Sequence, residues 1–152
     1  MSASLEAAFP QLLSSGYRVT SPPDQDYNCI AWAAGDGEQW WWPDPLGLYY
    51  WPDGVLRAET LEAFVACYRH QGYEQAANSD REPGWEKIAL YADENGTPTH
   101  AARQLPSGAW TSKLGQLEDI EHSTPEALTS AVYGKAAITL RRRCRVGEEG
   151  EA

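Results

Sequence analysis

Apolar residues recur every three or four positions between Thr60 and Gln71, at Leu61, Phe64, Val65 and Tyr68. This spacing puts them on one face of a helix that can bury itself against a core. Thr60 can cap the start of that helix, and Gly72 can end it. The pattern therefore predicts a helix over residues 60–71.

Two further segments carry helical signals. Residues 4–14 place Leu5, Phe9, Leu12 and Leu13 on one face, but Pro10 lies inside the pattern and should kink the helix or split it in two. Ser123 and Glu126 have the spacing of a capping box, with Pro125 in the first turn, and Gly134 follows. We expect a helix from Ser123 to about Tyr133.

Alternating apolar and polar residues indicate strands in the second half of the chain. Residues 86–92, 99–105 and 109–113 are separated by turn sequences, the first of which contains Asn95-Gly96. These three segments should form an antiparallel meander. Shorter strands are predicted at residues 17–20 and 136–140.

Length and charge narrow the class of protein. A chain of 152 residues fits one domain, and we expect residues 1–152 to form it, with 141–152 as a charged, frayed tail. The 22 acidic residues outnumber the 12 basic residues, for a net charge of -10. Such a surface repels phosphate backbones and anionic membranes, so we expect neither nucleic acid nor membrane as a partner.

The cysteines indicate a reducing compartment. Cys29, Cys67 and Cys144 are an odd number and contain no CxxC pair, which argues against a disulfide framework and a zinc site. The first residues lack a basic region followed by an apolar run, and no later stretch reaches the length of a membrane span. We therefore expect a cytoplasmic protein without a metal or other cofactor.

The stretch YNCIAWA, residues 27–33, contains the best candidate nucleophile. Cys29 lies where a polar, proline-containing loop becomes a short apolar helix that Gly35 can end. A thiol in the first turn of a helix faces unpaired N–H groups, which favour its thiolate and lower its pKa. The alternative is that Cys29 is a buried core thiol without chemistry.

An aromatic loop follows this helix between Gly35 and Gly54. Its glycines and prolines defeat both helical and strand periodicity, which predicts an ordered irregular loop. Its tryptophans can either roof the core or line a substrate cleft or partner surface. The tryptophans concerned are Trp40, Trp41, Trp42 and Trp51, with Trp32 on the preceding helix.

A thiolate needs a base, and His100 is the best placed of the three histidines because it begins a predicted strand of the central meander. The alternative for His100 is a partly buried strand histidine whose hydrogen bonds are satisfied. A metal site that gathers His100, His122 and a cysteine lacks diagnostic spacing.

These segments resemble the papain-like cysteine hydrolases, especially their compact NlpC-like branch. The resemblance lies in YNCIAWA at residues 27–33, THAARQL at 99–105 and WTSKLG at 110–115. These runs are also similar to small uncharacterised bacterial domains that we associate with that superfamily. In the superfamily, the cysteine begins a helix, the histidine begins a strand, and a polar residue on the next strand orients the histidine.

The resemblance implies a role for each matching residue. Cys29 would be the nucleophile, His100 the base and later the acid, and Ser112 the orienting residue. Serine departs from the usual Asn, Asp, His or Gln, and Asp119, Glu118 or a loop carbonyl could take its place. The oxyanion would be held by the Cys29 N–H with a second donor from Asn28 or Gln25.

The resemblance predicts an α+β papain-like fold, with helices packed on an antiparallel sheet of four to five strands. It also predicts a hydrolase or acyl transferase that acts on an amide or peptide bond of a small substrate or a protein. The competing hypothesis is an inactive interaction module that binds a partner through its tryptophan-rich loop.

Overall fold

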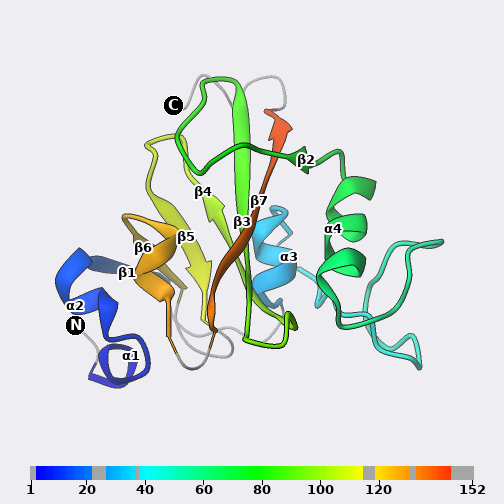
Figure 1. The fold of residues 1–152 in the computed structure, drawn as a ribbon, viewed down its shortest axis with the longest axis horizontal. Helices are drawn as coiled ribbons and strands as arrows, with labels where there is room; N and C mark the ends of the chain where they lie inside the picture. The colour runs from blue at the N-terminus through cyan, green and yellow to red at the C-terminus, as the bar shows by residue number, and fades with distance from the viewer. Residues whose placement is uncertain (1–2, 22–26, 37, 115–118, 131–132, 145–152) are drawn as a thin grey trace.

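A computed structural model describes residues 3–21, 27–36, 38–114, 119–130 and 133–144 of the chain. One sheet dominates this structure (Figure 1), and its strands follow the order β1-β6-β5-β4-β3-β7-β2. Neighbouring strands are antiparallel across the sheet. The strands are β1 (Tyr17–Ser21), β2 (Glu74–Gln75), β3 (Trp85–Ala92), β4 (Pro98–Gln104), β5 (Trp110–Lys113), β6 (Asp119–His122) and β7 (Lys135–Arg143).

Helices cover both faces of the sheet (Figure 1). On one face lie α3 (Cys29–Ala33) and α4 (Leu61–His70), and on the other lie α1 (Ala3–Ala8), α2 (Gln11–Ser15) and the 3₁₀ helix η1 (Pro125–Leu128). Each face has its own apolar core. Because side chains alternate along a strand, Ala101 of β4 joins the core under α3 and α4, and Ala102 joins the opposite core.

The predicted fold class is wrong. The structure is mainly β, with seven strands in one sheet, rather than helices packed on a papain-like sheet of four or five strands. The helices are short, since α3 has five residues and α4 has ten. The two unpredicted strands are β2, which is only two residues long, and β6, whose sequence DIEH lacks an apolar alternation.

Two helix predictions that rest on local sequence signals were more reliable than the predicted fold class. The helix predicted at residues 60–71 is confirmed as α4, and the Thr60 hydroxyl caps it by accepting a hydrogen bond from the Ala63 N–H at 3.2 Å. The expected split at Pro10 is confirmed too, because α1 ends at Ala8 and α2 begins at Gln11.

The helix predicted from Ser123 to Tyr133 is wrong. Only the single 3₁₀ turn of η1 forms, and its cap position is Thr124. The Ser123 hydroxyl instead donates to the Ser15 carbonyl at 3.3 Å, so the predicted capping box does not form. Residues 131–132 lie outside the described residues.

The charged tail begins later than expected. The strand β7 continues through Arg143, and Arg141 and Arg142 form ion pairs rather than lying free in solvent. Arg141 pairs with Glu74 at 3.0 Å and Glu82 at 2.7 Å, and Arg142 pairs with Glu86 at 2.5 Å. These pairs fix the edge of the sheet, and residues 145–152 lie outside the described residues.

Candidate functional site

Cys29 is the first residue of α3, as the sequence indicated. Asn28 caps this helix: its side-chain oxygen accepts from the Ala31 N–H at 3.1 Å and from the Trp41 N–H at 3.2 Å. The Asn28 amide nitrogen donates to the Trp41 carbonyl at 2.7 Å. Asn28 therefore ties the aromatic loop to the start of α3, and the oxyanion role expected for it stays a prediction.

The thiol of Cys29 is half-buried and packs against the core under α3 and α4. Burial raises its pKa to about 11, although the N–H groups of Ala101, Cys29 and Ile30 and the charge of Lys113 lower it. The expectation of a lowered thiol pKa is therefore wrong, because desolvation of the thiol raises its pKa by more than the N–H groups at the start of the helix lower it. At neutral pH, Cys29 is therefore a neutral thiol.

His100 lies on β4 and is completely buried. The Tyr133 ring stacks on its imidazole, with ring centroids 4.2 Å apart and planes 6° from parallel. Tyr91, its partner on β3, meets the imidazole edge-on at 5.2 Å. The two tyrosines hold the ring in one orientation.

A chain of hydrogen bonds runs from His100 to β6 and the turn after it. The His100 Nε2 lies 3.0 Å from the Ser112 Oγ, which lies 2.8 Å from the His122 Nε2. The His122 Nδ1 lies 2.8 Å from the Thr124 carbonyl oxygen. The structure thus brings His100 and Ser112 together, as expected from the resemblance, and adds His122.

Both histidines in this chain are neutral at pH 7. Burial lowers the pKa of His100 well below its usual value, and the nearby His122 lowers it further. Burial also lowers the pKa of His122, to about 4, against the smaller opposing effects of the Thr124 carbonyl and Glu121. A neutral imidazole is the form that can accept a proton from a thiol.

Cys29 packs against the core under α3 and α4, whereas the His100 ring stacks on Tyr133, which belongs to the opposite core. Ala101, whose N–H acts on the Cys29 sulfur, directly follows His100 in the strand. Burial raises the pKa of Tyr133 and the charge of a Cys29 thiolate raises it further, so the sulfur lies within electrostatic reach of the ring stacked on His100. Within the described residues, the His100 Nδ1 has no hydrogen-bond partner. No hydrogen bond joins Cys29 to His100 in the part of the chain that the structure describes.

The other proposed supporting residues are placed elsewhere. Asp119 is buried, accepts a hydrogen bond from the Tyr27 hydroxyl at 2.6 Å and lies 4.0 Å from the Lys113 ammonium. It does not take part in the hydrogen-bond chain of His100, where Ser112 occupies the orienting position. Gln25 and Glu118 lie outside the described residues.

Most of the tryptophans roof the core. Trp41 and Trp51 are buried, and both Trp42 and Trp51 pack edge-on against Phe64 of α4. Trp32 donates its indole N–H to the Thr111 hydroxyl at 3.3 Å. Trp40 packs on Tyr49, with ring centroids 6.1 Å apart. These contacts favour the core interpretation over a tryptophan-lined cleft.

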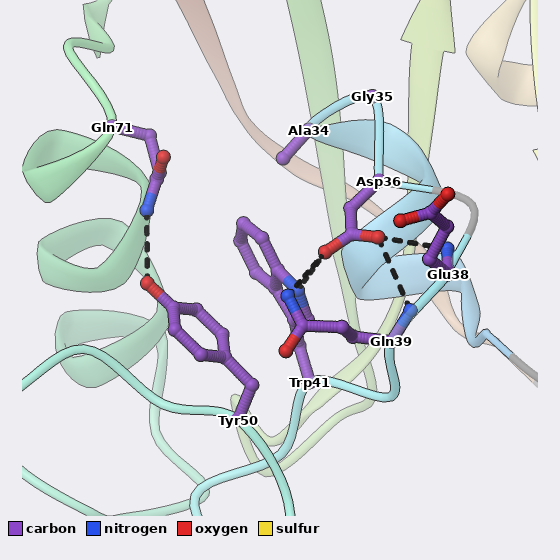
Figure 2. A pocket seen from close by; sticks show the side chains of 8 residues that line it. All are labelled: Ala34, Gly35, Asp36, Glu38, Gln39, Trp41, Tyr50 and Gln71. Atoms are coloured by element: carbon purple, nitrogen blue, oxygen red, sulfur yellow. Dashed lines mark hydrogen bonds between the residues drawn. The ribbon is translucent and has the colours of Figure 1, made fainter.

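A cavity of about 600 Å³ lies at the other end of α3 from Cys29 (Figure 2). Its polar side chains bond to one another: Asp36 accepts from the Trp41 indole at 2.9 Å and from the Gln39 side chain at 2.9 Å. Across the cavity, Gln71 donates to the Tyr50 hydroxyl at 3.3 Å. Neither Cys29 nor His100 is among the described residues that line it. The cavity is therefore separate from the predicted site.

The sequence did not reveal three residues that shape the surroundings of His100. His122 lies in a polar stretch that was interpreted as a connection to a helix. Tyr91 could have been found, because it lies opposite His100 once the hairpin around Asn95-Gly96 sets the register. Tyr133 reaches the ring from a turn with no sequence signal for that contact.

The fold and site define a mainly β protein with a thiol at the start of α3 and a buried His-Ser-His chain across β4, β5 and β6. The chain belongs to the family described as "Domain of unknown function (DUF7689)", whose sequence model matches residues 18–141. The matched range includes Cys29, His100, Ser112 and His122. No curated protein and no solved structure matches the chain. None of the described helices is long and apolar enough to cross a membrane.

Proposed function

We propose that this protein is a cysteine hydrolase or acyl transferase that acts on an amide or peptide bond. One observation carries the proposal: the His100 Nδ1 is buried with no hydrogen-bond partner in the described part of the chain, and the N–H of Ala101, the next residue of the strand, acts on the Cys29 sulfur. A buried nitrogen without a hydrogen bond costs free energy, and a chemical role such as accepting a proton is one reason for a protein to keep such a group. The substrate class comes from the resemblance to the papain-like cysteine hydrolases at residues 27–33, 99–105 and 110–115.

The proposed reaction begins with two neutral groups. This step requires the Cys29 sulfur and the His100 Nδ1 to come together, because the two side chains pack in cores on opposite faces of the sheet. The thiol then gives its proton to the His100 Nδ1 as the sulfur attacks the carbonyl carbon of the amide. The oxygen of that carbonyl becomes negative, and N–H groups at the start of α3, such as those of Cys29 and Ile30, would stabilise it. His100 then protonates the departing nitrogen, the C–N bond breaks, and a thioester remains on Cys29.

A second step releases the acyl group. Water, or the amine or hydroxyl of an acceptor, attacks the thioester while His100 takes the proton from that nucleophile. The proton returns to the Cys29 sulfur, so the enzyme is regenerated. The product is an acid when water attacks and a new acyl derivative when another acceptor does.

The proposal is tested by labelling with a peptide ketone that traps nucleophilic thiols, used as a panel with different side chains next to the ketone. We expect a covalent adduct on Cys29, identified by peptide mass analysis, and no adduct in Cys29→Ala. Cys144→Ser is the matched control because Cys144 is a half-buried cysteine outside the site that forms no disulfide, and it should be labelled as the wild type is. Labelling that spares Cys29 across the whole panel would contradict the proposal.

The second candidate function is a binding module, and a surface feature favours it. The aromatic loop exposes Leu46, Leu48 and Tyr49, whose exposed fractions are 79%, 71% and 46%, and Leu56, just after the loop, is 66% exposed. Exposed apolar side chains close together in the chain are typical of protein contact sites. A binding module would keep its partner after Cys29→Ala and lose it after Leu46→Ser with Leu48→Ser. An enzyme would lose its activity after Cys29→Ala and keep it after the double leucine replacement.

We also propose a cytoplasmic location. The cysteines in the described residues are free thiols, which persist in a reducing compartment. The proposed partners are a peptide or another amide-containing substrate.

A further inference from the structure

The hydrogen-bond chain behind His100 allows one arrangement of protons. The Thr124 carbonyl can only accept, so the His122 Nδ1 carries a hydrogen and donates it. Because His122 is neutral, its Nε2 has no hydrogen and accepts one from the Ser112 hydroxyl at 2.8 Å. Ser112 has no second hydrogen to give.

These positions also determine which nitrogen of His100 carries a hydrogen. With its hydrogen committed to His122, the Ser112 oxygen can only accept from the His100 Nε2–H at 3.0 Å. A neutral imidazole carries one hydrogen, so the His100 Nδ1 is bare. This agrees with the absence of any hydrogen-bond partner for that nitrogen among the described residues.

We propose that His122 is a positioning residue that fixes the direction of the Ser112 hydroxyl and thereby the tautomer in which His100 can accept a proton. Its catalytic meaning rests on the proposed function, but the tautomer itself does not. The inference rests on the buried side chains of His100, Ser112 and His122 and on the two short contacts between them.

The assignment explains how serine can stand where a stronger orienting group is usual. An isolated hydroxyl can donate as well as accept, so it could equally hold the tautomer with hydrogen on Nδ1, which would block the base. An acceptor on the far side of the hydroxyl removes this ambiguity. Hydrogen bonds in such a chain also polarise one another, which strengthens the bond from an imidazolium at His100 to Ser112.

The test is long-range ¹H–¹⁵N NMR of the three histidines in the free protein at pH 7. We expect hydrogen on the Nε2 of His100 and on the Nδ1 of His122. In His122→Leu, the Ser112 hydroxyl is released, and His100 should shift toward the tautomer with hydrogen on Nδ1. The rate of probe labelling at Cys29 should then fall by at least about tenfold, because that tautomer is not a base toward the thiol.

Two variants separate this role from general damage. His122→Gln keeps a carbonyl oxygen that can accept from Ser112, so it should retain both the wild-type tautomer and most of the labelling rate. His70→Leu, at the exposed end of α4, should change neither. If His122→Leu does not fold, the inference is still tested by which nitrogen of His100 carries the hydrogen in the wild type.

Hydrogen on the His100 Nδ1 in the wild type would overturn the inference, and so would an unchanged tautomer in folded His122→Leu. These failures are distinct from failure of the proposed function. The latter would leave Cys29 unlabelled by every probe while the His100 tautomer remained as assigned.

Discussion

Replacing His100 by alanine lowers the rate of probe labelling at Cys29 by roughly 10²- to 10⁴-fold at pH 7, the usual contribution of a positioned general base. The expected loss is large because burial raises the pKa of the Cys29 thiol to about 11. At pH 7 only about one such thiol in 10⁴ ionises unaided. The rate is measured by peptide-resolved mass analysis over time.

The control variant for this experiment is His100→Gln. Glutamine can still donate a hydrogen bond to the Ser112 hydroxyl, but it cannot accept the thiol proton, so labelling should be as slow as in His100→Ala. Cys67, which is fully buried in the core under α4, reports on folding and should stay unreactive in both variants. A folded His100→Gln protein that is labelled at the wild-type rate would rule out His100 as the base.

Replacing Gly134 by alanine destabilises the fold by about 3 kcal/mol or more, the range of strained backbone positions and severe overpacking. Gly134 has φ +70°, and a Cβ there would lie 2.0 Å from the Ala92 carbonyl oxygen and 2.9 Å from the Asp93 Cα. These neighbours are backbone atoms that cannot rotate away. The free energy of unfolding is measured by urea denaturation.

Gly96→Ala isolates the steric part of this effect. Gly96 also has a positive φ, +79°, but nothing lies within 4 Å of its added Cβ. It should therefore cost only the conformational penalty of about 1–2 kcal/mol. Equal losses in the two variants would mean that Gly134 is not a point of close approach. Gly134 follows Tyr133, so its variant should also disturb the ring that stacks on His100.

The parts of the fold that the sequence predicted depend on local signals. Helix α4 has a complete apolar stripe and a cap, and the hairpin of β3 and β4 has an Asn-Gly turn. The β6 strand has neither, because Asp119 and His122 are buried through hydrogen bonds to Tyr27, 92 residues away, and to Ser112 on the neighbouring strand β5. A polar strand of this kind can be found only when its partners are known.

The candidate site likewise has features that local sequence signals predict and features that they do not. Cys29 at the start of a helix and His100 at the start of a strand follow from short motifs. The net pKa of the thiol does not, because it depends on how deeply α3 packs on the sheet. The role of Ser112 depended on an acceptor ten residues away, His122, and no local spacing signals that pairing.

The central claim, that His100 takes the proton of Cys29, is tested most directly by the pH dependence of Cys29 alkylation with iodoacetamide. An unassisted thiol with a pKa of about 11 reacts roughly tenfold faster with each pH unit through the neutral range. If His100 is the base, the wild-type rate should instead be nearly constant between about pH 6 and pH 8. The lowered pKa of His100 keeps the imidazole neutral there, and the rate should fall only when the pH drops through that lowered value. A tenfold rise per pH unit that is the same in the wild type and in His100→Gln would contradict the claim.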